Sequence, residues 1–244
     1  MPKFAVILML GLLSASLLSG CDRGDRVQLL LEAKRADTSD EAMDRARDIV
    51  KRRIGALGSS GATVVRQRPN RILVTLPRAE DAAQVKALVG RSGRLDFRLV
   101  DTGVTRKQLA GGRAPPGTRI LPLPSEGPGA RIPVRDRPTI TASMIVDAQP
   151  TFDPAGQPSV NVRFNEAGRL RLARATRENV GRPFAIVLDD EVISAPAINE
   201  PILGGQAQIS GNFTVESAKA LAIALRSGAL PVDLVVIEER VLAQ

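Results

Sequence analysis

Few residue types in this 244-residue sequence support catalysis. The chain has no His and a single Cys, so neither a Ser-His-Asp triad nor a Cys-His pair can form. The same composition excludes a zinc site of Cys and His ligands, a haem held by His and an intrachain disulfide. An enzyme would have to use carboxylates, Ser or Lys alone. We therefore expect a protein that is not an enzyme, with no catalytic residues, no metal site and no cofactor.

The acidic and glycine-rich clusters of the chain have structural explanations. The run Asp189-Asp190-Glu191 has the residue types of a metal site, but it lies between two β-like segments. Asp is common in tight turns because it tolerates the left-handed backbone conformation. The glycines at 204–205 and 211 have neither the Lys nor the spacing of a phosphate-binding loop. We interpret both clusters as turns.

The chain is basic, with 34 Lys and Arg against 26 Asp and Glu and a formal net charge of +8. Its positive residues are scattered, and the aromatic platforms usual in nucleic-acid modules are scarce, since the only aromatic residues are six Phe. We expect no nucleic-acid partner, but solvated Arg side chains or an attraction to anionic lipid headgroups. After Arg169, the residues Arg171, Arg174 and Arg177 follow at three-residue spacing on a predicted helix. This basic stripe is either solvated or a partner contact.

The single cysteine follows an apolar amino-terminal segment. Lys3 supplies a positive charge, residues 4–18 are mostly apolar, and Leu-Ser-Gly directly precedes Cys21. This is the layout of a secretory signal peptide, and small residues before a Cys resemble the lipobox of bacterial lipoproteins. We predict a signal peptide over residues 1–20 and lipidation of Cys21, which would hold the mature protein to a membrane of the cell envelope, facing the periplasm. The alternative is an uncleaved anchor, although a mostly apolar stretch of 15 residues falls short of the roughly 20 that span a bilayer.

The first part of the mature chain alternates between strand and helix patterns. A capping box, Thr38 with Glu41, begins a helix that Gly58 ends, and a second helix is expected over residues 79–89. Strands are predicted over residues 27–33, 63–67, 71–76 and 95–100. The order βαββαβ predicts a ferredoxin-like base domain, assigned to residues 21–110.

A segment rich in Pro and Gly separates this base from a second α/β region. Residues 111–138 contain seven Pro and five Gly, which predicts a linker or long surface loop with at most a short extended piece at 130–135. Residues 139–230 form the predicted head, with helices capped by Asn165 and Thr214 and a hairpin that turns at 189–190. A final strand lies within residues 231–244.

Many of these stretches are similar to one known family. Weaker similarity lies in residues 54–58, 65–67, 71–77 and 95–100, and the strongest is Arg177-Glu-Asn-Val-Gly-Arg-Pro-Phe-Ala-Ile-Val-Leu-Asp189. The similarity continues through residues 192–196, 199–205, 208–214, 225–231 and 238–240. Together these segments resemble the first periplasmic domain of SecD, a subunit of the bacterial protein-export machinery.

The resemblance implies an α+β protein in which an α+β head is inserted into a ferredoxin-like base, with the last strand returning to the base. In that family the head is thought to swing on the base and engage the translocating chain, while membrane helices paired with SecF couple export to proton flow. SecD continues into those helices after the segment that matches residues 238–240, whereas this sequence ends at Gln244. We therefore expect no proton coupling by this chain alone.

Two functions are consistent with the sequence. The first is a membrane-anchored accessory protein that binds unfolded exported polypeptides during protein export, with Sec translocon subunits as candidate partners. An extended chain would bind in a groove at the head–base junction, through strand edges and apolar side chains. The alternative is an envelope lipoprotein that keeps the SecD-like fold as a binding module for a different envelope complex.

Overall fold

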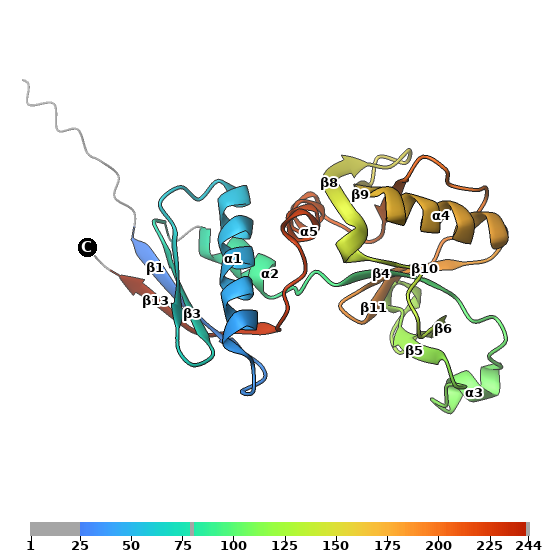
Figure 1. Ribbon diagram of the computed structural model, residues 1–244, viewed down its shortest axis with the longest axis horizontal. Coiled ribbons are helices and arrows are strands. Elements are labelled where there is room, and N and C mark those ends of the chain that lie inside the picture. Colours follow the sequence, from blue (N-terminus) through green and yellow to red (C-terminus); the bar gives the residue numbers. More distant parts are fainter. Residues whose placement is uncertain (1–24, 79–80, 243–244) are drawn as a thin grey trace, which may run out of the picture.

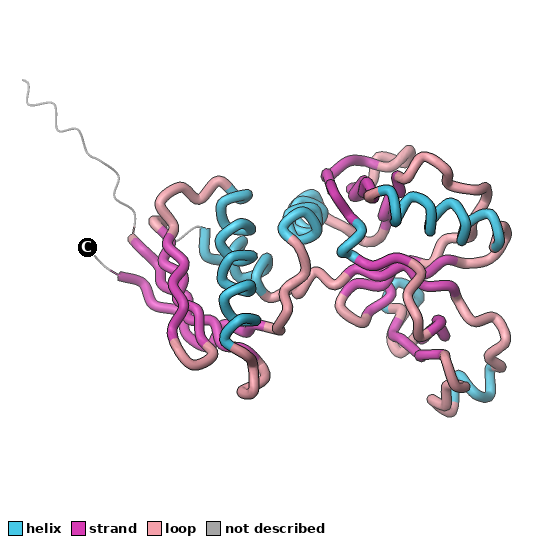
Figure 2. Tube along the Cα trace, in the orientation of Figure 1, coloured by secondary structure: helices cyan, strands magenta, loops and turns pink. Residues whose placement is uncertain are grey.

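The computed structural model describes residues 25–78 and 81–242, which fold into two parts that lie side by side along the long axis of the molecule (Figure 1). The first and last strands share one part, the base, and the middle of the chain forms the other, the head. Figure 2 shows that both parts combine helices with sheets, which confirms the predicted α+β class. In the described part of the chain no helix is both long and apolar enough to cross a membrane.

The base is a four-stranded antiparallel sheet in the order β13-β1-β3-β2, with helices α1 and α2 packed on one face (Figure 1). This strand order is that of a ferredoxin-like fold. Its elements are β1 (Arg26–Ala33), α1 (Asp40–Leu57), β2 (Thr63–Gln67), β3 (Arg71–Leu76), α2 (Asp81–Val89) and β13 (Leu234–Leu242).

Sequence periodicity explains how the base forms. Every second residue of β1 is buried, so one face of the sheet is apolar and is covered by the helices. Helix α1 ends at Gly58, whose φ of 86° is the left-handed conformation that glycine adopts readily. Its N-cap is Ser39 rather than the predicted Thr38, because the Ser39 hydroxyl accepts the Ala42 N–H while the Thr38 hydroxyl donates to the Arg35 carbonyl.

The sixth element of the base is not the one that the local pattern indicated. Sequence analysis placed residues 95–100 in the base, but β4 (Leu95–Leu99) pairs with β10 and β7 in the head. The ferredoxin-like sheet is completed by β13, which pairs with β1 along its whole length. Alternation identifies a strand and its buried face, but it does not specify which neighbouring strand receives the backbone hydrogen bonds.

The head contains two larger sheets, in the orders β11-β10-β4-β7 and β12-β9-β8, together with helices α4 and α5. The predicted hairpin, both helices and their caps Asn165 and Thr214 are confirmed, whereas β8 was not predicted because its residues include polar side chains and a Pro. The remaining elements of these layers are β7 (Ile140–Thr141), β8 (Ile145–Phe152), β9 (Pro158–Phe164), α4 (Glu166–Glu178), β10 (Phe184–Leu188), β11 (Glu191–Ser194), β12 (Gln206–Ser210) and α5 (Val215–Ser227).

The segment interpreted as a linker, residues 111–138, is largely a packed hairpin of the head. Strands β5 (Thr118–Pro122) and β6 (Arg131–Arg135) pair with each other, after a short helix α3 (Arg106–Ala110). Leu121 and Val134 are buried against β10 and β11. Most of the Pro and Gly residues lie outside the two strands, although Pro122 ends β5 and Pro133 lies within β6. The few apolar residues between them provide the packing of the hairpin.

Candidate functional site

The two parts of the molecule meet where helix α5 of the head packs on α1 and α2 of the base (Figure 1). Leu88, Ile223 and Ala224 are buried there, and Leu57 and Ala220 pack against them. The chain crosses between the parts twice, after α2 on the way into the head and after α5 on the way back. Because these apolar side chains pack against each other, they are not available to line a binding groove at the junction.

A single buried arginine connects both crossings to the base. Arg53 of α1 is 0% exposed, and its guanidinium donates to carbonyl oxygens of both crossings. The donor–acceptor distances are 2.8 Å to Leu88, 2.5 Å to Arg91, 2.8 Å to Ser92 and 3.1 Å to Gly228. The Leu88 carbonyl lies in the last turn of α2, those of Arg91 and Ser92 lie in the outgoing crossing, and that of Gly228 lies in the return, so one side chain holds both crossings to the base.

The charge of Arg53 is maintained in spite of its burial. Desolvation lowers its pKa to about 10, and the nearby Asp189 carboxylate opposes this shift. Arg53 therefore stays protonated at neutral pH. Its neighbour Asp189 accepts hydrogen bonds from the Ser92 hydroxyl and from the N–H groups of Gly93 and Arg94.

The acidic run at 189–191 has a structural role, as the sequence indicated. Asp189 and Asp190 have φ values of 51° and 67°, so they form the left-handed turn between β10 and β11. Within the described residues, no group of three Cys, His, Asp or Glu side chains is arranged to hold a metal ion.

The hollow beside the junction is polar rather than apolar. It has a volume of about 410 Å³ and lies between the start of α1 and the return crossing. Most of its lining is charged or hydroxylated: Lys34, Arg35, Asp37, Thr38, Ser39, Ala42, Arg94, Pro231, Val232 and Asp233. This hollow therefore does not have the apolar lining of the groove expected at the head–base junction.

An apolar pocket lies instead inside the head, between its two larger sheets. Its volume is about 270 Å³, and its inner wall consists of side chains from β4, β10 and α4. The wall residues are Phe97, Leu172, Phe184 and Ile186, and the rim residues are Pro196, Ala197, Ile198, Asn199, Glu200, Ile202, Ala207 and Gln208. Most of the rim comes from the loop between β11 and β12.

Specific backbone and side-chain bonds position this rim loop. The buried Thr176 hydroxyl accepts the Ile202 N–H at 2.9 Å and donates to the Leu172 carbonyl at 2.8 Å. Gly205 ends the loop with a φ of 68°, and a Cβ there would lie 2.7 Å from Cγ of Arg169. This glycine is therefore required by a close approach to α4, not by a phosphate.

An unpaired strand edge borders the pocket. Among the described strands β12 pairs with β9 alone, so its other edge offers backbone donors and acceptors. Ala207 and Gln208 belong both to β12 and to the pocket rim. An extended polypeptide paired with this edge would place alternate side chains next to an apolar hollow.

The predicted basic stripe lies elsewhere in the head. Arg171, Arg174 and Arg177 are exposed on α4, and Arg174 pairs with Glu178 at 2.9 Å. None of the three lines the apolar pocket. Cys21, the predicted lipidation site, lies outside the described residues.

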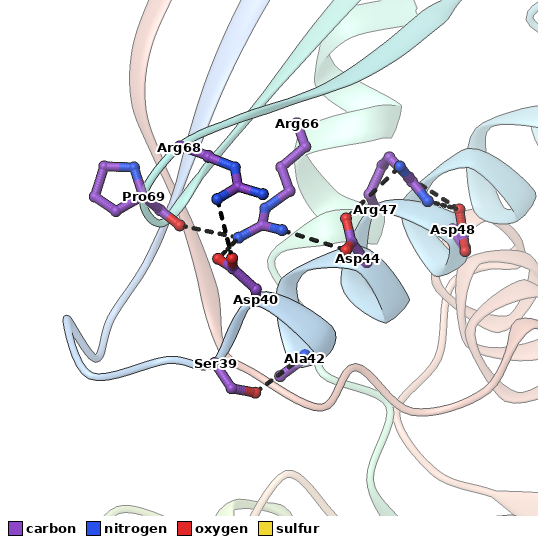
Figure 3. Close-up of polar contacts among 9 residues, drawn as sticks. All are labelled: Ser39, Asp40, Ala42, Asp44, Arg47, Asp48, Arg66, Arg68 and Pro69. Carbon is purple, nitrogen blue, oxygen red and sulfur yellow. Dashed lines mark hydrogen bonds and ion pairs between the residues drawn. The ribbon is translucent and has the colours of Figure 1, made fainter.

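A charged network in the base has a structural role. Figure 3 shows the Arg66 guanidinium between Asp40 and Asp44 of α1, with Arg68 also directed at Asp40. The hydrogen bond from Arg66 holds the pKa of Asp40 below its ordinary value. This network fastens the β2–β3 hairpin to the start of α1.

Sequence reasoning missed both Arg53 and the pocket. Arg53 had a signal, since it falls on the apolar stripe of α1 beside Val50 and Ile54. The pocket had none, because its walls come from segments that are far apart in the sequence.

A ferredoxin-like base with an inserted two-sheet head is the architecture that these observations define. Residues 118–232 match the family model of the SecDF P1 head subdomain, and residues 43–102 match that of the amino-terminal part of the SecDF P1 domain. The chain belongs to the P1 domain family of the protein translocase subunits SecD and SecDF, as the sequence resemblance indicated.

Individual relatives agree with this assignment. The protein translocase subunit SecD of Acetobacter pasteurianus is 38% identical over 201 residues, which cover 82% of this chain and 38% of the relative. That of Rhodobacter capsulatus is 37% identical over 218 residues, or 89% and 39% of the two chains. This chain thus spans about two fifths of the length of these relatives. They are translocase subunits, and the family is not one of enzymes.

Solved structures are similar over most of the chain. A structure of SecDF described as a membrane component that enhances protein export is 34% identical with a TM-score of 0.69, covering 88% of this chain and 100% of that one. SecDF in a super-membrane-facing form gives 31% identity and a TM-score of 0.71, covering 90% of this chain and 31% of that one.

Proposed function

We propose that this protein binds extended, unfolded polypeptide in the head during protein export in the cell envelope. The observation that carries the proposal is the apolar pocket bordered directly by the free edge of β12. Backbone pairing at the edge is independent of sequence, and the pocket accepts an apolar side chain without directional contacts. Family membership supports the same conclusion, because a related SecDF is described as enhancing protein export.

Such binding is expected to be weak. Ordering a flexible chain costs free energy for each residue that is fixed, which offsets much of the gain from pairing and burial. Affinities of about 1–100 μM fit one inserted apolar side chain and a few backbone hydrogen bonds. Weak binding suits a protein that must release each segment of a passing chain.

Filling the pocket is expected to weaken polypeptide binding by about tenfold. Burying one Leu-sized side chain contributes about 1.5–3 kcal/mol, and Ala197→Trp would place an indole at the rim where that side chain enters. The measurement is a fluorescence-anisotropy titration of a labelled, reduced and carboxymethylated α-lactalbumin with residues 22–244, which contain every described element.

The matched control is Ala110→Trp, the same substitution at an exposed position of α3 that does not line the pocket. It should leave the affinity for the unfolded probe unchanged. Equal weakening by both variants, or no binding of the probe by the wild type, would contradict the proposal. Tight binding of a single folded envelope protein instead would support a binding module of a different envelope complex.

We also propose that Cys21 is lipidated and that the protein is held to a membrane facing the periplasm. The support is the sequence Leu-Ser-Gly-Cys after an apolar segment. Intact-mass spectrometry of the membrane fraction should find an acylated Cys21 as the first residue, and Cys21→Ala should abolish both cleavage and acylation. A wild-type protein that retains Met1 without a lipid would refute this.

A further inference from the structure

The hairpin region of the head, residues 106–137, concentrates the positive charge of the chain. It contains seven Lys or Arg residues and two acidic ones, a net charge of +5 out of +8 for the whole sequence. The region comprises α3, β5 and β6, and we call it the basic hairpin. It projects from the head at the end of the molecule away from the base (Figure 1).

Most of these cations have no carboxylate partner. Arg119 pairs with Asp190 at 3.1 Å, and Arg135 pairs with Asp101 at 3.3 Å. The other five are exposed, and the described part of the chain offers none of their side chains an ion pair or hydrogen bond; they are Arg106, Lys107, Arg113, Arg131 and Arg137. Their charge is therefore available to an external anion.

The packing of the hairpin places two cations of β6 on its outer face, the unpaired Arg131 and the paired Arg135. Val134 of β6 is buried in the cluster with β10 and β11. Side chains alternate across a strand, so Arg131 and Arg135 lie on the opposite face of β6 from Val134. Helix α3, which carries Arg106 and Lys107, packs near the same strand. The exposed cations thus come from neighbouring segments of the basic hairpin.

The composition of this surface indicates which kind of partner it can bind. No described residue of the basic hairpin is a large exposed hydrophobic side chain, so it has none of the apolar anchors that protein interfaces use. It has no Phe, Tyr or Trp on which nucleic-acid bases could stack. Neither cavity described above includes its five unpaired cations, so the charge is spread over a surface rather than gathered in a site for one small anion.

We infer that the basic hairpin adsorbs to the anionic headgroups of phospholipids. Headgroups form an extended negative surface that attracts dispersed Lys and Arg side chains without pockets or apolar contacts. The inference rests on the proposed envelope location, which places the protein beside a bilayer. Because β1 begins in the base at the other end of the molecule, attachment at both ends would lay the long axis along the membrane (Figure 1).

The test is co-sedimentation of residues 22–244 with vesicles of phosphatidylcholine, with or without phosphatidylglycerol. We expect binding only to the anionic vesicles and its loss at high salt, because salt screens exposed charges. Each Lys or Arg near the surface contributes about 1 kcal/mol, or roughly fivefold, so neutralising three should weaken binding by about 100-fold. The variant combines Arg106→Gln, Lys107→Gln and Arg131→Gln.

The matched control removes the same three charges from the α4 stripe, as Arg171→Gln, Arg174→Gln and Arg177→Gln. It should bind anionic vesicles within about threefold of the wild type, and both variants should unfold at the wild-type temperature in circular dichroism. Equal loss in both variants would show a response to net charge only and overturn the inference.

Two further outcomes would also overturn it. One is the absence of any preference for anionic vesicles. The other is binding of a polyglutamate peptide through the same three residues while vesicles are not bound, which would assign the surface to an acidic polypeptide. Binding of the unfolded probe is measured separately and should be unaffected in the basic-hairpin variant, so failure here and failure of the proposed function are distinguishable.

Discussion

Replacing Arg53 with Met should lower the free energy of unfolding by about 4 kcal/mol, the largest effect expected for any single polar residue of this protein. The substitution would remove one donor from each of four carbonyl oxygens, at the end of α2 and on both crossings between base and head. The Ser92 carbonyl would keep the Leu230 N–H as a donor. Buried acceptors that lose a partner retain the cost of having left water and gain nothing in return. We expect the loss in equilibrium denaturant unfolding followed by circular dichroism.

Two variants separate this effect from a general response to losing an Arg from α1. Arg45→Met removes an exposed Arg of the same helix, which among the described residues forms an ion pair with Glu41 alone, and should change stability by less than about 0.5 kcal/mol. Arg53→Lys keeps the charge but cannot spread donors over four acceptors, and should fall between the two. If Arg53→Met were as stable as Arg45→Met, the junction would not depend on this side chain.

Replacing Phe97 with Ala should cost about 3–5 kcal/mol, because it removes a large side chain from the centre of the head core. Phe97 is 2% exposed, and its ring packs edge-on against Phe164, with ring centroids 5.5 Å apart. It also contacts the Phe184 ring in a tilted arrangement, with centroids 5.8 Å apart. It also belongs to the inner wall of the apolar pocket. Its loss would both leave a cavity and merge that cavity with the proposed binding site.

The control for Phe97 is the same substitution at Phe152, which is 61% exposed at the end of β8. Phe152→Ala should change the unfolding free energy by less than about 0.5 kcal/mol in the same denaturant titration. A Phe97→Ala protein as stable as the Phe152→Ala protein would mean that the head core is not organised around Phe97.

The junction and the pocket indicate that the base positions the head, and they support the proposal that the head binds the polypeptide. The base contacts α5 through buried apolar side chains, and Arg53 of the base donates a hydrogen bond to the return crossing. This region therefore holds the head in place. The head carries the apolar pocket and the free edge of β12 that borders it. The expectation that polypeptide binds at the head–base junction is therefore replaced by the proposal that it binds within the head.

Sequence by itself was sufficient for most of the helices and strands and for the family, but not for β8 or the β5–β6 hairpin. Capping residues such as Asn165 and Thr214, and the left-handed turn at Asp189, act within a few residues of themselves, so their effect is visible in a short window. The α+β class follows from the same local periodicities. Family membership required only that enough of these segments be similar.

Tertiary structure alone decided which strands are neighbours and what the polar residues contact. The strand at residues 95–99 has the same alternation whether it pairs in the base or in the head, since periodicity specifies a buried face and not a partner. Residues 118–135 fold into a hairpin because Leu121 and Val134 find an apolar surface on β10 and β11, which no local pattern reports. Arg53 and the pocket depend in the same way on groups brought together from distant segments, because packing and long-range hydrogen bonds are set by the folded arrangement as a whole.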